Sequence, residues 1–287
     1  MTGRAVLGRV GLLALPLAGI LIWFLVDVLA RPPSWMLPSP QAVASTLWSE
    51  HDRLWFHAQA TIGQALLGLA LAVVVGLAIA VVISASRAAD LAIYPWVVAS
   101  QAVPILAIAP IIAVWLDYGA AQVAVAFIIC VFPVIVTGVD GLRSTDPQLG
   151  RVALSLGASR MWVWRRVTLP AALPALFSGL RLAAVFAVTG AVVAEYVGAD
   201  RGLGYLTEIS TSQFETQVAF AAIAWLAVIG IALFAAVSGL ERLALPHRHH
   251  SVRPAWRTRR GMADTCLLYT SPSPRDLNPN LGWRLVR

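Results

Sequence analysis

The sequence predicts an all-α integral membrane protein with about six transmembrane helices. Of its 287 residues, 59% are hydrophobic and 12% are charged, whereas about a quarter of the residues in a soluble domain are charged. The mean hydropathy is +0.77. In addition, six apolar runs are each long enough to cross a bilayer, because about 20 helical residues span roughly 30 Å of hydrocarbon.

The six expected spans lie within residues 10–245, after a short N-terminal segment, residues 1–9. They cover residues 10–29, 58–84, 91–116, 120–139, 175–197 and 218–240. The first run also resembles a secretory signal, since Arg4 and Arg9 precede it. We expect a retained span instead, because the run is long and no small-x-small cleavage site follows it.

The arginines predict the orientation of these spans. All 21 basic residues are arginine. With the N-terminus inside, 18 of them fall on the inner side and only Arg31, Arg53 and Arg201 fall outside. Basic residues collect on the cytoplasmic side of membrane proteins, so both termini are expected in the cytoplasm. The net charge of +7 is then a topology signal and requires no nucleic-acid partner.

The lack of lysine excludes one class of function for this chain. A standard P-loop needs a lysine to reach the nucleotide phosphates, so the chain cannot carry one. The sequence predicts no cofactor and no metal site: His247, His249 and His250 lie in a basic tail, residues 246–260, without an accompanying carboxylate or cysteine cluster. Cys130 and Cys266 imply no disulfide framework.

The segment between the fourth and fifth spans, residues 141–174, predicts a helix–turn–helix. Asp146 is a typical N-cap with Pro147 at the first helical position, and the apolar spacing that follows is helical. Gly157 is expected to end this helix in the left-handed conformation. Ser159 can cap a second short helix, and Leu169-Pro170 is expected to interrupt the chain before the next span.

This segment resembles the signature loop of ABC-importer permeases, in which EAA, three residues, G, nine residues and I-x-L-P follow one another. Every spacing fits, although Arg151 and Val152 replace the usual Glu and Ala, and Val167 replaces Ile. Because Arg151 reverses a charge, a salt bridge made by the usual glutamate is in question here. The resemblance assigns the ATPase-coupling loop to Arg151, Val152, Ala153, Gly157, Ala158, Val167, Leu169 and Pro170.

Further motifs are similar to the nitrate/sulfonate/taurine-type branch of these permeases. They are residues 37–43 (LPSPQAV), residues 101–104 (QAVP) and residues 202–206 (GLGYL). Together with residues 191–198 (AVVAEYVG), the last motif is closest to permeases for thiamine-pyrimidine precursors. The resemblance implies a type I permease fold in the bacterial inner membrane and a small polar or anionic organic solute, with a pyrimidine precursor ahead of sulfonates, taurine or nitrate.

The resemblance also implies a set of partners. Two permease subunits, as a homodimer, would form the pathway, two ABC ATPase subunits would dock in the cytoplasm, and an external binding protein would deliver the solute. The chain itself would be a non-catalytic permease, which agrees with its lack of a P-loop lysine.

Three residues are candidates for the translocation pathway. Gln101 is polar within a span and either faces the pathway or makes a structural hydrogen bond. Pro104 either bends a pathway-lining helix or is a packing kink. Glu195 is expected at the membrane interface, with substrate contact or gating as the second interpretation. Small residues at four-residue spacing in the fifth span, from Gly179 to Ala191, favour close helix packing.

Two other classes of function compete with the importer. A channel or secondary transporter would not need a rigid docking loop. A membrane-embedded enzyme would need a nucleophile–base pair or a metal site in the bilayer, and the six expected spans contain no histidine. Finally, residues 261–287 resemble a translated sequencing-adapter string, so we expect them to be non-native, with a disordered tail as the alternative.

Overall fold

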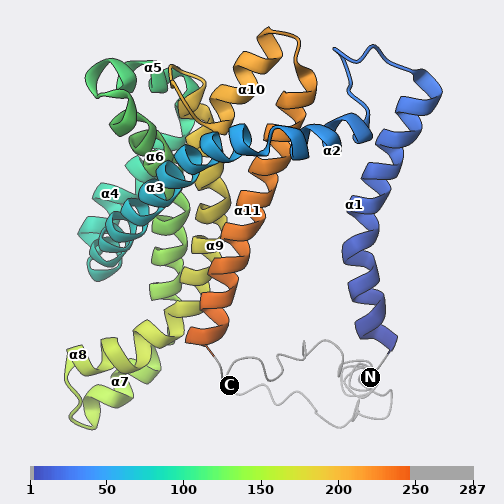
Figure 1. Cartoon of the computed structure of the whole chain (residues 1–287). Coiled ribbons are helices and arrows are strands. Elements are labelled where there is room, and N and C mark those ends of the chain that lie inside the picture. Colours follow the sequence, from blue (N-terminus) through green and yellow to red (C-terminus); the bar gives the residue numbers. More distant parts are fainter. Residues whose placement is uncertain (1–2, 246–287) are drawn as a thin grey trace, which may run out of the picture. The chain divides into compact units, whose positions relative to one another are not determined.

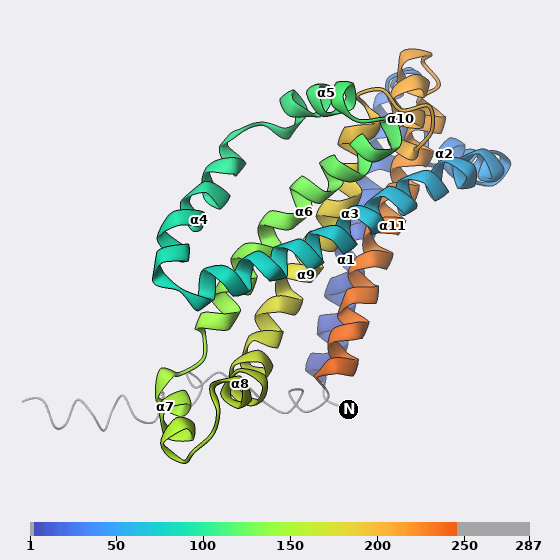
Figure 2. The same ribbon diagram turned by 90° about the vertical axis from the view of Figure 1, so that its left-hand side faces the viewer.

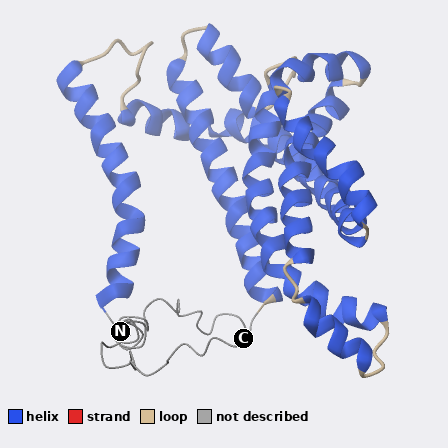
Figure 3. Ribbon diagram, turned by 180° about the vertical axis from the view of Figure 1, so that it is seen from behind, coloured by secondary structure: helices blue, strands red, loops and turns tan. Residues whose placement is uncertain are grey.

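The structure, a computed structural model, describes residues 3–245, and within that range it consists of helices and connecting turns without a strand (Figures 1 and 3). The all-α prediction is confirmed for this part of the chain. The described helices up to Glu241 belong to one compact unit. The predictions for the basic tail, its three histidines and residues 261–287 lie outside the described residues.

The helices follow the expected runs with several additions. In chain order they are α1 (Gly3–Ala30), α2 (Pro40–Ser49), α3 (His51–Ala85), α4 (Arg87–Ala99), the 3₁₀ turn η1 (Ser100–Ala102), α5 (Ile105–Trp115), α6 (Tyr118–Arg143), α7 (Pro147–Ser155), α8 (Arg160–Val163), the π-helical turn η2 (Trp164–Thr168), α9 (Leu169–Glu195), α10 (Leu203–Ser212) and α11 (Thr216–Ala244). The short helices α2 and α10 lie outside the six expected spans.

The surface of the long helices is that of a membrane protein. Among the described residues, four stretches are long and apolar enough to cross a bilayer, namely His51–Ala85, Gly119–Arg143, Arg160–Glu195 and Thr216–Ala244. Large apolar side chains on α1, α3 and α11 remain uncovered: Leu15 is 79% exposed, Val74 69% and Ile231 69%. Lipid tails can cover such side chains, whereas water would penalise them.

The expected third span is not one straight helix. The helical segments Arg87–Ala102 and Ile105–Trp115 are bent by 99°, and Figure 2 shows the chain turning between α4 and α5. Pro104 precedes α5 with an extended backbone, and proline both lacks an N–H and disfavours helix in the residue before it. Within α1, which runs from Gly3 to Ala30, the part whose side chains are described, Ala14–Ala30, is apolar but by itself shorter than a span. Six spans are therefore not confirmed: the described residues give four, or five with the bent pair.

The prediction of a break at Leu169-Pro170 is wrong. The helix runs on from Arg160 to Glu195, and the chain absorbs the proline through η2 instead. The Leu169 N–H bonds to the carbonyl of Trp164, five residues back. This wider π turn accommodates Pro170, which has no N–H to donate and whose ring would collide with the carbonyl four residues back in a regular helix.

Small residues form the core where α3, α6 and α9 meet. Ala183, Ala187 and Ala191 of α9 are fully buried, and they pack in one cluster with Ala65 of α3 and Cys130 of α6. The packing interpretation of the small-residue stripe is thus confirmed within this chain. Methyl-sized side chains let the helix backbones approach closely, and this close packing fixes the helices that carry the candidate sites.

Candidate functional site

The helix–turn–helix between α6 and α9 is built by local capping. The Asp146 carboxylate accepts a hydrogen bond from the Gln148 N–H at 2.8 Å and thereby caps α7. Gly157 ends the turn with φ of +86°, a left-handed conformation that glycine adopts without strain. The Ser159 hydroxyl accepts from the Trp162 N–H at 3.2 Å and caps α8. These three predictions from sequence are confirmed.

The helix–turn–helix carries an apolar face that no described residue covers. Leu149 is 58% exposed, Val152 57% and Leu156 82%, and these three residues share one side of the α7 region. Together with α8, α7 lies at the end of the helix bundle opposite α5 and α10 (Figures 1 and 2). Contiguous exposed apolar side chains commonly mark a surface that binds another protein.

Glu195, at the C-terminal end of α9, lies in the interior and not at a solvated interface. Its side chain is fully buried. The Thr61 hydroxyl donates to Glu195 Oε1 at 2.7 Å, and the Gly204 N–H donates to Oε2 at 2.6 Å. The carboxylate is covered because the segment after α9 folds back over it, a contact that the local sequence does not reveal. The position of Glu195 at the membrane interface stays a prediction.

The same contacts cap the start of α10. The Leu203 N–H donates to the Thr61 hydroxyl oxygen at 2.9 Å, and the Gly202 N–H donates to His57 Nδ1 at 3.1 Å. The first N–H groups of a helix lack hydrogen-bond acceptors within the helix. In α10, side chains of α3 and α9 provide these acceptors. We call His57, Thr61 and Glu195 the α10 clamp.

Glycine is required at the clamp for both conformation and space. Gly202 has φ of +135°, and a Cβ at this position would overlap the Glu195 carboxylate. A Cβ on Gly204 would approach Glu195 Oε2 to 2.8 Å. The Gly-Leu-Gly motif thus has a steric explanation in this fold, since it lets the backbone reach the carboxylate.

The other two pathway candidates lie at the bend between α4 and α5. Gln101 belongs to η1 and Pro104 directly precedes α5. The side chain of Gln101 is exposed, and its amide donates to the neighbouring Ser100 hydroxyl at 3.4 Å. Among the described residues, no hydrogen bond joins Gln101 or Pro104 to the α10 clamp. A pathway role for Gln101 and Pro104 stays a prediction.

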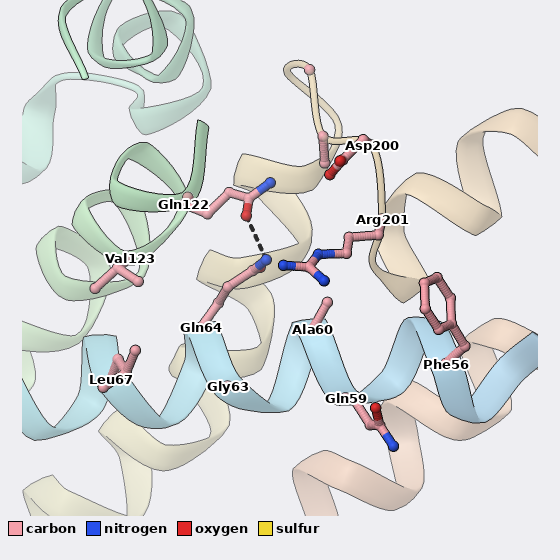
Figure 4. A pocket seen from close by; sticks show the side chains of 13 residues that line it. Phe56, Gln59, Ala60, Gly63, Gln64, Leu67, Gln122, Val123, Asp200 and Arg201 are labelled. Atoms are coloured by element: carbon pink, nitrogen blue, oxygen red, sulfur yellow. Dashed lines mark hydrogen bonds between the residues drawn. The ribbon is translucent and has the colours of Figure 1, made fainter. Parts of the chain in front are cut away.

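A chamber lined by both apolar and polar side chains opens beside the clamp, at the end of the bundle that carries α10. Its volume is about 910 Å³, and its walls come from α3, the start of α6 and the segment that precedes α10. The polar side chains that line it are Gln59, Gln64, Gln122, Asp200 and Arg201. In Figure 4, Gln64 and Gln122 face each other and are joined by a hydrogen bond from Gln64 Nε2 to Gln122 Oε1.

The clamp residues on α3 and the residues of the chamber were not predicted from the sequence. Gln64 and Gln122 each lie in an apolar run near the same end of the bundle, and this is a signal, because a polar residue in a span usually faces protein or water. Thr61 offers no such signal, because isolated threonines are common in membrane helices. Arg201 was noted only as one of three arginines on the outer side.

The helices, the apolar surface and the capped loop define a multi-pass membrane protein. Residues 72–246 match the family of binding-protein-dependent transport system inner membrane components. The chain belongs to this family and is an ABC-importer permease subunit, a transport component and not an enzyme.

Individual relatives agree with this assignment. A probable ABC transporter permease protein of Haemophilus influenzae is 38% identical over 222 residues, which cover 77% of this chain and 91% of the relative. The formylaminopyrimidine transport permease protein ThiX of Halalkalibacterium halodurans is 36% identical over 231 residues, 80% of this chain and 92% of the relative. The taurine transport system permease protein TauC of Escherichia coli is 30% identical over 251 residues, 85% of this chain and 90% of the relative.

A solved structure shows the same fold. A chain of the MetNI methionine ABC transporter in an inward-facing conformation superposes with a TM-score of 0.58 at 18% identity, over 67% of this chain and 97% of that chain. The expectation of a type I ABC-importer permease fold is confirmed.

Proposed function

We propose that this permease subunit couples to a separate ATPase through the helix–turn–helix between α6 and α9. The observation that carries the proposal is the uncovered apolar face of Leu149, Val152 and Leu156, held on a loop whose turn and helices are capped internally. A rigid loop transmits a displacement of its partner to the spans, whereas a flexible loop would absorb it. The proposed contact residues are Arg151, Val152, Ala153, Gly157, Ala158, Val167, Leu169 and Pro170.

The remaining partners follow from the family. Its description names transport that depends on a binding protein, so an external binding protein would deliver the solute at the end of the bundle that carries α10. The arginine distribution supports an orientation with both termini and the coupling loop in the cytoplasm. A second copy of the chain would complete the pathway as a homodimer in the bacterial inner membrane.

The solute we propose is a small polar or anionic organic molecule, with a pyrimidine precursor ahead of sulfonates, taurine or nitrate. Relatives named for formylaminopyrimidine and taurine transport support this range. The lining of the chamber agrees with a polar solute, since five of its side chains carry amide, carboxylate or guanidinium groups.

Co-purification and uptake test the coupling proposal together. The full chain is expected to co-purify with an ATPase, and Gly157→Asp should abolish ATP-dependent uptake, because only glycine adopts φ of +86° at little cost and the added charge would enter the docking surface. Gln148→Asp is the matched control, since it adds the same charge at the favourable N-terminal end of α7. A chain that takes up solute without an ATPase, or a Gly157→Asp variant with unchanged uptake, would identify a channel or secondary transporter instead.

A further inference from the structure

The helix–turn–helix between α6 and α9 carries charge of a single sign. Residues 147–170 contain no acidic residue and four arginines: Arg151, Arg160, Arg165 and Arg166. All four are exposed, and none of them forms an ion pair with another described residue. Because like charges gathered on one surface repel one another, a partner of opposite charge would stabilise this surface.

Two arginines on the neighbouring long helices are paired within the chain. Arg143 of α6 and Asp90 of α4 form an ion pair at 2.9 Å, and Arg181 of α9 pairs with Glu241 of α11 at 2.6 Å. The acid nearest to the helix–turn–helix along the chain, Asp146, is engaged in capping α7. The described part of the chain therefore provides counter-charges within the bundle and none for the arginines of the helix–turn–helix.

The start of α8 lies too far from the bilayer for lipid head groups to provide these counter-charges. The apolar part of α6 ends at Asp140, and a Cβ on the next residue, Gly141, would lie 3.0 Å from the Ala172 carbonyl of α9. Arg160 precedes Ala172 by 12 residues of continuous helix, which is about 18 Å at 1.5 Å per residue. The head-group layer adds only about 5–8 Å on each side of the hydrocarbon. Figures 1 and 2 show α7 projecting beyond the end of α11, so a soluble partner can reach this surface.

The arginines and the apolar face belong to one small body. A Cβ on Gly150 would lie 3.6 Å from Val163 Cγ1, so α7 packs directly against α8. Arg151 is next in the chain to Val152 of the apolar face, and Arg160 begins α8. In protein interfaces, an apolar centre is commonly surrounded by charged residues that select the partner and set its orientation. This body therefore suits a groove with an apolar floor and an acidic rim.

We propose that the ATPase surface that receives the helix–turn–helix is acidic, with carboxylates that bind Arg151 and Arg160. A guanidinium presents its N–H donors in a plane and can bind a carboxylate through two hydrogen bonds. Arg151 stands where the signature loop has glutamate, so the charge required of the partner at this point is reversed. This inference rests on the proposed function and names the chemistry of its partner.

Zero-length cross-linking tests the inference, because all basic residues of the chain are arginine and it contains no lysine. Arg151→Lys and Arg160→Lys each introduce one lysine and keep the charge. A water-soluble carbodiimide is added to the full-length chain in phosphatidylcholine nanodiscs, together with the ATPase that co-purifies with it. The carbodiimide activates a carboxylate of the ATPase as an acylisourea, and the lysine amine displaces the urea to form an amide. Each variant should cross-link to an aspartate or glutamate of the ATPase, identified by mass spectrometry. Arg87→Lys is the matched control, since Arg87 is exposed but lies outside the helix–turn–helix, and it should not cross-link.

Binding kinetics provide a second readout. Arg151→Glu should raise the Kd for the ATPase about tenfold or more, because a carboxylate then faces an acidic surface, whereas Arg151→Lys should keep most of the affinity. The association rate of the parent chain should fall as salt is raised, since salt screens attraction between exposed charges. This last measurement requires no substitution, so it remains decisive where a variant fails to fold.

Three results would overturn the inference while leaving the proposed coupling in place. They are an ATPase that binds Arg151→Glu as tightly as the parent, an association rate that is independent of salt, and a complex in which neither lysine variant cross-links. Nanodiscs of phosphatidylglycerol that weaken ATPase binding to the parent but not to Arg160→Gln would assign Arg160 to lipid head groups and also overturn it. Parent chain that recruits no ATPase refutes the proposed function itself, and this inference with it.

Discussion

Removal of the Glu195 carboxylate should destabilise the end of the bundle that carries α10. In Glu195→Ala, the Gly204 N–H loses its acceptor in a fully buried position, whereas the Thr61 hydroxyl can still donate to the His57 carbonyl at 3.4 Å. An unpaired buried donor costs about 1–3 kcal/mol. At roughly 2–4 °C per kcal/mol for a chain of this size, the apparent Tm should fall by about 2–12 °C.

Thermal denaturation of the purified chain in detergent, followed by loss of the monodisperse species, measures this effect. Glu208→Ala is the control, because Glu208 is an exposed acid on α10 itself. Its replacement should change the Tm little, as is usual for exposed positions. If Glu195→Ala melts at the same temperature as Glu208→Ala, the carboxylate does not support α10 and the clamp is wrong.

A double-mutant cycle with Gly202→Ala makes the test sharper. In the parent, alanine at this position suffers from the positive φ and from overlap of its Cβ with the Glu195 carboxylate. In the Glu195→Ala background only the backbone strain of about 1–3 kcal/mol remains. The two substitutions should therefore be non-additive, with an interaction energy of about 1–3 kcal/mol. Additive effects would show that the carboxylate does not occupy the space beside Gly202.

Two further predictions concern packing and charge in the bundle. Ala187→Leu should destabilise the chain by about 1–3 kcal/mol, because Ala187 is fully buried between helices. The control Ala236→Leu, on the exposed side of α11, should leave the stability unchanged. Equal melting temperatures for the two variants would contradict the close packing around Ala187. Arg181 and Glu241 form an ion pair at 2.6 Å, so Arg181→Glu should lower the Tm by like-charge repulsion and the exchange Arg181→Glu with Glu241→Arg should restore part of it. An exchanged pair no more stable than Arg181→Glu alone would show that the pair does not hold α9 to α11.

The caps and the turn of the helix–turn–helix could be predicted from sequence because they depend on local contacts. The caps at Asp146 and Ser159 join groups two or three residues apart, and the turn at Gly157 depends on the conformational freedom of one residue. A single sequence contains all of this information. The same reasoning failed at Pro170, because a proline in the first turn can either end a helix or be accommodated by a π turn, and only the surrounding helix packing selects between them.

The sequence by itself determined that this protein is an all-α membrane permease with a capped helix–turn–helix before α9. Apolar runs of bilayer length, the arginine distribution and local caps follow from chemistry within about 20 neighbouring residues. Only the tertiary structure decided that Glu195 is buried, that residues 134 positions apart join in the α10 clamp, and that Gln64 meets Gln122 across the chamber. These contacts depend on how closely α3, α6 and α9 approach one another. That approach is set by the size of small side chains on all three helices together, and no single segment of the sequence specifies it.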